Sequence, residues 1–201
     1  GGAGAGRPTR RLARARTPLF LSYAGAGLGY RLPMTVRPLL AQQQLPEGHW
    51  LLDGAWLIVA LCTIPAPWLW NRLGAVMGEL FALKLNYAVQ LAGVLMAVIW
   101  PGAVGLLACA VLVGSTFVGT VLLTQRIGRA LHPHQGPRLS AAMVAVYGFT
   151  QMVGPWLTKQ WLDLGGTLAS AFAIGVAALA FGLIFVFFVP RPETVHAGTS
   201  R

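Results

Sequence analysis

Arg31 has the most unusual setting in this sequence, because it interrupts an apolar run that extends from Pro18 to Ala41. Counting about 12 residues from Leu19 at about 1.5 Å each places it about 18 Å into a bilayer core of about 30 Å. A charged side chain at that depth costs on the order of 2.5–3.5 kcal/mol. We therefore expect Arg31 to face a cavity and bind anionic groups by charge-assisted hydrogen bonds, the alternatives being structural pairing or a tolerated defect. Arg37 is expected near the outer interface, which its side chain can reach.

Hydroxyl and amide side chains lie on two further apolar segments. Thr116, Thr120 and Thr124 recur at every fourth position beside Gly119, so they share one helix face. Their hydroxyls either bond the carbonyls of their own helix or form a polar wall of a cavity. Gln151 either makes an interhelical hydrogen bond or contacts a substrate.

The segment from 75 to 99 carries polar residues on one face. Glu79, Asn86, Gln90 and Gly93 lie within about 40° of each other on a helix, whereas Lys84 points about 140° away. We expect this stripe to face other helices and to form structural hydrogen bonds with them. Lys84 is expected to pair with Glu79 only loosely. Glu79 is the one acid well inside an apolar segment, so a titratable carboxylate at mid-bilayer is missing.

Catalytic and cofactor signatures are absent from the sequence. There is no H-E-x-x-H, G-x-S-x-G or Walker pattern. His132 and His134 lie on a polar loop, where solvation is the expected state, and Cys62 and Cys109 lie inside apolar runs, as small hydrophobic residues do. We expect neither an enzyme nor a bound cofactor or metal.

The composition indicates an integral membrane protein. Of the 201 residues, 56% are hydrophobic and 10% are charged, with a mean hydropathy of +0.65, whereas soluble domains have about 25% charged residues. The net charge of +10 is also typical of nucleic-acid binders, but the basic residues lie mostly at the ends of apolar runs. We therefore expect a lipid bilayer as the partner and no nucleic acid.

Six apolar segments predict an all-α integral membrane domain over residues 18–190. Residues 1–17 are expected to form a flexible basic cytoplasmic segment or linker, and residues 191–201 a cytoplasmic tail. The motifs NRLG, WPG, HPHQGPR and DLGG are typical of the turns between helices. The expected membrane-spanning helices are 18–40, 51–70, 75–99, 102–124, 139–160 and 167–189.

Charged and aromatic residues predict the orientation of these helices. If six spans alternate, 11 of the basic residues fall on one side, which predicts that both termini are cytoplasmic in a multi-pass protein of the cell (inner) membrane. Tryptophans near the predicted span ends are expected to anchor at the membrane interfaces: Trp50, Trp70, Trp100, Trp156 and Trp161.

Four segments resemble a known family. A G-x-x-Q-x-x-G-P run, preceded by T-F-x-G in the previous helix, is the strongest match, and NRLG resembles the D/N-R-x-G loop of the major facilitator superfamily. From about residue 19 to 190 the chain resembles the C-terminal half of such a transporter, in its YbfB/YjiJ-like branch. Arg31 departs from the family, in which this position is usually apolar. The four segments are YAGAGLGYRLPMT, PAPWLWNRLGAVMGEL, STFVGTVLLTQRIGRALHP and AVYGFTQMVGPWLTKQWLDLGG.

The resemblance implies six helices in two inverted three-helix repeats, forming one half of the fold around a central cavity. It also implies a partner that completes the cavity, either the N-terminal six-helix half or a second copy. The first helix of each triplet lines the cavity in this fold. The substrate-binding residues implied are Tyr30, Arg31, Thr35, Thr116, Thr120 and Gln151, and the gating or conformational residues are Asn71, Arg72, Gly74, Gly154 and Pro155.

The expected function is secondary active transport of a small organic solute by alternating access. Arg31 favours an anionic or carboxylate-bearing solute. The alternative is a membrane protein without transport activity, either a truncated remnant or an assembly partner, in which Arg31 is a tolerated lesion.

Overall fold

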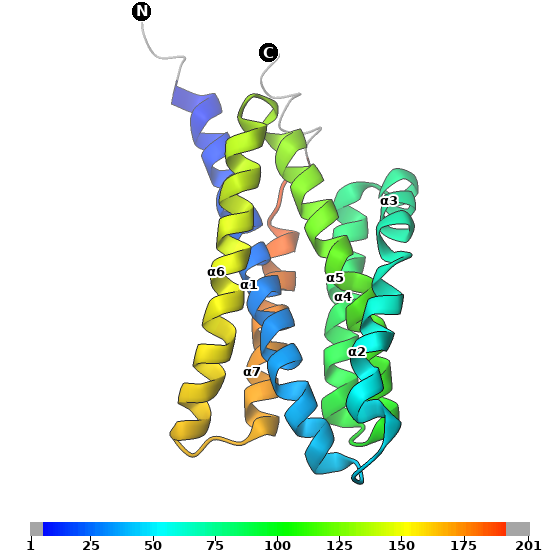
Figure 1. Ribbon diagram of the computed structural model, residues 1–201. Helices are drawn as coiled ribbons and strands as arrows, with labels where there is room; N and C mark the ends of the chain where they lie inside the picture. The colour runs from blue at the N-terminus through cyan, green and yellow to red at the C-terminus, as the bar shows by residue number, and fades with distance from the viewer. Residues whose placement is uncertain (1–5, 192–201) are drawn as a thin grey trace, which may run out of the picture.

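The computed structural model describes residues 6–191, and it describes side chains from residue 17 onward. Within these residues the chain is helical throughout, without strands (Figure 1). The helices pack side by side in one elongated bundle. They are α1 (Gly6–Gln44), α2 (Trp50–Thr63), α3 (Ala66–Met77), α4 (Glu79–Ile99), α5 (Ala103–Leu131), the short 3-10 helix η1 (Pro133–Gln135), α6 (Gly136–Asp163) and α7 (Leu168–Phe187).

Three of the described helices, α4, α5 and α7, are long and apolar enough to cross a membrane. The pair α2–α3 bends by 41° and would be a fourth span if it crosses as one unit. Helices α1 and α6 run beside α7 along the bundle (Figure 1). Both are more polar, since α1 carries Arg31 and Arg37 and α6 carries Gln151 and Lys159. The six-span arrangement therefore stays a prediction.

The second expected span is broken at Pro65. Pro65 has no backbone N–H, and its ring clashes with a continuing helix, so α2 ends at Thr63 and α3 begins at Ala66. As a result the NRLG motif lies inside α3, and its predicted position in a turn is wrong. The turn comes later, at Gly78, whose φ of 89° favours glycine.

Small residues allow α1 and α7 to pack closely. A Cβ added at Gly25 would lie 2.8 Å from the carbonyl oxygen of Ala178, and one at Gly29 would lie 2.6 Å from Cβ of Leu179. Both distances are too short for a side chain. The predicted packing role of Gly25 and Gly29 is confirmed, and it agrees with the use of small residues between membrane helices.

Polar side chains join α4 to α5 in the interior. Asn86 Nδ2 donates to the carbonyl oxygen of Thr116 at 2.9 Å, and Thr120 Oγ1 donates to Asn86 Oδ1 at 2.6 Å. Gln90 accepts a longer bond from Thr120, at 3.2 Å. The structural role predicted for the stripe on residues 75–99 is confirmed for Asn86 and Gln90.

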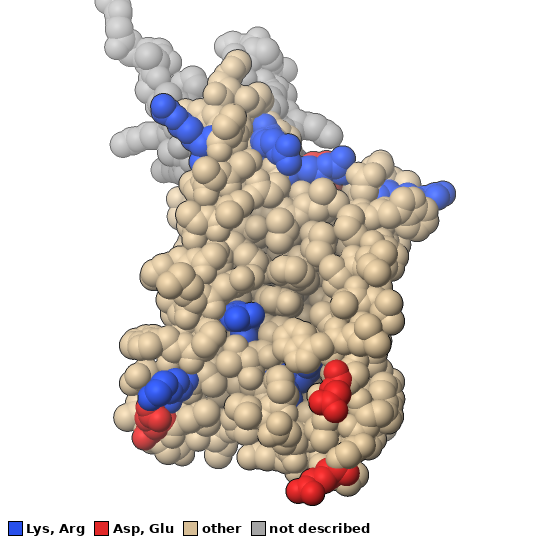
Figure 2. Space-filling view, in the orientation of Figure 1, with Lys and Arg blue, Asp and Glu red and all other residues tan. Residues whose placement is uncertain are grey.

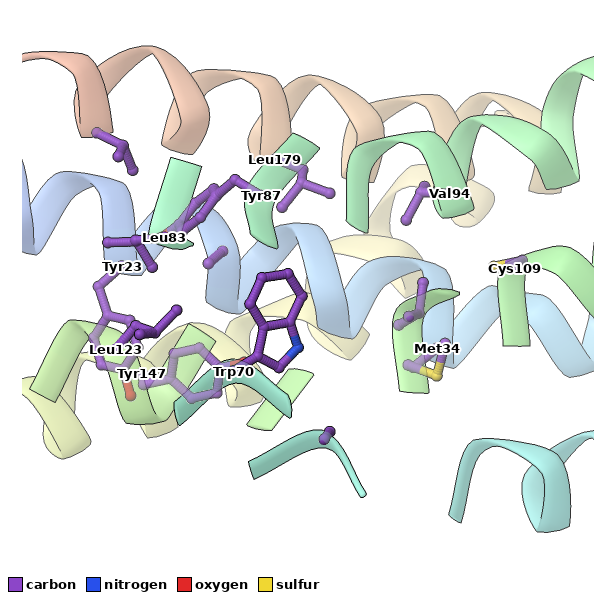
Figure 3. Close-up of a cluster of buried hydrophobic side chains, with 14 of the residues drawn as sticks. Tyr23, Met34, Trp70, Leu83, Tyr87, Val94, Cys109, Leu123, Tyr147 and Leu179 are labelled. Carbon is purple, nitrogen blue, oxygen red and sulfur yellow. The ribbon is translucent and has the colours of Figure 1, made fainter. Parts of the chain in front are cut away.

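Trp70 lies in the hydrophobic core rather than at an interface (Figure 3). Its side chain is 3% exposed, and Nε1 donates to the carbonyl oxygen of Ser115 at 2.6 Å. The interfacial position predicted for Trp70 is therefore wrong, because the break at Pro65 turns α3 against α5. The other predicted anchors are exposed: Trp50, Trp100, Trp156 and Trp161.

Charge is distributed unevenly between the two ends of the bundle. Figure 2 shows a band of basic side chains across the end of the bundle where α5 ends and α6 begins, while acidic side chains gather mainly at the opposite end. This asymmetry is of the kind that sets orientation in a bilayer.

Candidate functional site

The face of α1 that packs toward α5 and α6 carries aromatic side chains. The Tyr30 ring stacks on Phe117 of α5 with centroids 4.3 Å apart, and Tyr23 stacks on Tyr147 of α6 at 4.6 Å. Phe117 and Tyr147 are themselves 6.3 Å apart. These four rings connect three helices into one aromatic seam, which fixes the backbone of α1 beside Arg31.

The side chain of Arg31 extends from α1 toward α6. A Cβ added at Gly154 would lie 3.0 Å from Arg31 Cγ, so Gly154 provides the space in which the stem of Arg31 lies. The side chain as a whole is half-buried, and its Nε is buried without a hydrogen-bond partner among the described residues. Arg31 is therefore a cation that no described carboxylate neutralises.

Gln151 lies one turn before Gly154 on α6, near the stem of Arg31. It also lies one turn after Tyr147, which belongs to the aromatic seam. Thr35 is half-buried on α1, and its hydroxyl donates to the carbonyl oxygen of Arg31 at 2.9 Å. The structure thus brings Tyr30, Arg31, Thr35 and Gln151 to adjoining parts of α1 and α6.

Thr116 and Thr120 lie elsewhere, in the interface between α4 and α5. Thr116 Oγ1 donates to the carbonyl oxygen of Leu112 at 2.7 Å, and Thr120 Oγ1 is bonded to Asn86. Both side chains are buried. In this conformation their hydroxyls are engaged inside the bundle, so the structure separates them from the group around Arg31.

Arg37 is a buried cation, so the prediction that its side chain reaches the outer interface is wrong. It is 2% exposed, and its two Nη atoms are buried without hydrogen-bond partners among the described residues. Its guanidinium carbon lies 5.0 Å from the ring centroid of Trp56 on α2. Arg37 follows Tyr23 and Tyr30 at seven-residue steps, which keeps it on the face of α1 that packs inward. That spacing is the sequence pattern that indicates its burial.

Comparison with known proteins identifies the chain. A family model described as "Uncharacterised MFS-type transporter YbfB" matches residues 2–187. The chain belongs to this YbfB-like family of the major facilitator superfamily. Searches of curated proteins and of solved structures gave no match. The family confirms the resemblance seen in the sequence, and it makes the chain a multi-pass membrane protein of a transporter family that is typically non-enzymatic.

The YbfB-like chain has a polar latch at the end of the bundle that carries the basic band. Arg126 of α5 donates from Nη1 to Asn71 Oδ1 of α3 at 2.6 Å, and its Nε lies 3.6 Å from Glu79 Oε1 of α4. One guanidinium thus connects three helices. Gly74 lies beneath, where an added Cβ would be 3.2 Å from Leu123 Cδ2. Of the predicted gating residues, Asn71 is part of this latch and Gly74 packs beside it.

Arg72, also predicted as a gating residue, turns away from the latch. Its guanidinium carbon lies 5.6 Å from the ring centroid of Trp68, one turn back on α3. The cation of the latch is instead Arg126. It was not among the predicted gating residues, because it is far from NRLG along the chain. On α6, Gly154 is in contact with Arg31 and Pro155 follows it inside the helix.

Arg126→Ala in the YbfB-like chain is expected to loosen the junction of α3 and α4. Exposed ion pairs contribute up to about 1 kcal/mol, so the population of the opened junction should rise by up to about five-fold. Hydrogen–deuterium exchange of the amides around Gly78 would measure this change. Arg129→Ala is the matched control, since the one hydrogen bond of its side chain among the described residues goes to the carbonyl oxygen of Gln125 in its own helix. Equal exchange rates in both variants would contradict the latch.

Proposed function

We propose that this chain is the C-terminal half of a secondary active transporter that moves a small organic anion by alternating access. The observation that carries the proposal is Arg31, a half-buried cation without a described carboxylate partner, in a chain of a transporter family. Such a residue inside a membrane segment is costly, and it marks a substrate or ion pathway when it is retained.

The solute is proposed to bind against α1 and α6. Arg31 supplies the charge, Gln151 and the Tyr30 hydroxyl supply hydrogen bonds, and Thr35 orients the α1 backbone. The aromatic seam holds these groups in place, because stacked rings allow little rotation. Thr116 and Thr120 would meet the solute only in a state in which α4 and α5 separate, since their hydroxyls are engaged in this one.

The proposed membrane arrangement has six spans, with both termini on the cytoplasmic side of the inner membrane. The first three and the last three spans would form the inverted repeats. The packing supports an interleaved arrangement, since α1 lies against α6 and α7 while α4 lies against α5. An N-terminal six-helix half, or a second copy, would then cover the face that carries Arg31.

Uptake into liposomes that contain the complete transporter tests this function. Radiolabelled monocarboxylates, dicarboxylates and organic cations of similar size would be compared, with and without an inward proton gradient. We expect uptake of at least one anion and of no cation, because the positive charge of Arg31 repels cations. Uptake of cations alone would contradict the anionic substrate class. Absence of uptake for every solute would favour the non-transporting alternative.

A further inference from the structure

A cavity of about 530 Å³ lies at the end of the bundle that carries the basic band. It opens between the end of α3, the beginning of α4 and the last residues of α5, and Arg191 reaches it from beyond α7. Gly78 keeps part of it open, because no atom lies within 4 Å of a Cβ added there. The cavity is distinct from the face around Arg31.

The charged side chains that line the cavity are Lys84, Arg191 and Glu79. The Glu79 carboxylate is held by Arg126 of the latch, with Nε and Oε1 3.6 Å apart. Lys84 forms no ion pair with any side chain between residues 17 and 191; its ammonium lies 4.6 Å from the ring centroid of Phe187. The one acid is thus already paired, and Lys84 is a cation of the lining without an ion pair among the described residues.

In the proposed membrane arrangement, on which this inference rests, Lys84 lies near the boundary between lipid headgroups and acyl chains. It lies five residues after the first residue of α4, which is about 7 Å along the helix. Lysine at such a depth extends its ammonium toward the headgroups along an apolar stem. Exposed apolar side chains lie beside these charges: Phe81 of the lining is 51% exposed, and Phe187, which Lys84 contacts, is 64% exposed.

We propose that this cavity binds the headgroup of an anionic phospholipid. The phosphate group lies against Lys84 and Arg191, and the acyl chains run along Phe81 and Phe187 into the bilayer. The first turn of α4 adds backbone N–H groups, since its N-cap Gly78 has no side chain to bond them. A zwitterionic headgroup fits less well, because its own ammonium would oppose the two cations.

Thermal unfolding of the purified full chain in detergent tests the site. Phosphatidylglycerol, phosphatidylcholine and inorganic phosphate are titrated separately, and the shift in melting temperature gives the apparent affinity. We expect phosphatidylglycerol to raise the melting temperature far more than either other probe. Lys84→Met, which keeps an apolar stem against Phe187, should weaken the affinity for phosphatidylglycerol about five-fold or more. Lys84→Arg should retain the affinity of the wild type.

Lys159→Met is the matched control. Lys159 lies near the end of α6, away from the cavity, and is paired with Asp163 at 2.6 Å. Its loss should therefore leave unchanged the shift in melting temperature that phosphatidylglycerol causes. If Lys84→Met does not fold, native mass spectrometry of Lys84→Gln counts the lipids that stay bound. Undiminished phosphatidylglycerol binding in Lys84→Met or Lys84→Gln would overturn the proposal. Equal stabilisation by phosphatidylcholine would overturn it as well, and equal stabilisation by inorganic phosphate would assign the cavity to a soluble anion.

Discussion

Arg31→Ala is expected to reduce anion uptake by the complete transporter by at least about ten-fold. A hydrogen bond to a charged group contributes about 1.5–3 kcal/mol, and in the proposed site this interaction is lost with the guanidinium. The stem of Arg31 lies over Gly154, so Arg31→Met is the cleaner variant, because it removes the charge and keeps most of that packing. Initial rates of uptake in liposomes, at matched amounts of inserted protein, would measure the effect.

Two controls separate a role in binding from a role in folding. Arg138→Met removes an exposed cation at the beginning of α6, outside the predicted site and gating residues, and uptake should be nearly unchanged. Arg31→Lys keeps the charge but loses the paired N–H donors of guanidinium, so uptake should fall to an intermediate rate. If Arg31→Met transports as well as the wild type, Arg31 is a tolerated defect and the solute binds elsewhere.

Features that depend on a single helix could be predicted from the sequence. Gly25 and Gly29 share a face at four-residue spacing, and they do pack closely against α7. Asn86 and Gln90 likewise share a face, and both are hydrogen-bonded inside the bundle. In each case helix periodicity alone determines which side chains share a face. Their packing or hydrogen bonding can then be predicted without knowing which helix lies opposite.

Features that depend on where a second helix packs could not be predicted in this way. The spacing of Arg37 from Tyr23 and Tyr30 indicates an inward face of α1, but the sequence does not place Trp56 of α2 over its guanidinium. The latch shows the same limit. NRLG drew attention to Arg72, yet the guanidinium that bonds Asn71 belongs to Arg126, 55 residues away.

Arg37→Met is expected to stabilise the folded protein. Burying an ion has an effective cost of several kcal/mol, whereas a desolvated cation–π contact such as that with Trp56 returns only about 2 kcal/mol. Replacing buried ionic groups with apolar ones of similar size commonly raises stability by about 1–4 kcal/mol. The melting temperature of the full chain in one fixed detergent would measure the change.

We expect Arg37→Met to gain stability because both Nη atoms of Arg37 lack a described hydrogen-bond partner while the residue is only 2% exposed. Arg138→Met is the control, because Arg138 is exposed at the beginning of α6 and should change stability by no more than about 0.5 kcal/mol. A lower melting temperature for Arg37→Met than for the wild type would mean that the guanidinium has a counter-charge in the folded protein. A stable Arg37→Met protein that no longer transports would instead indicate that this costly charge is retained for the transport cycle.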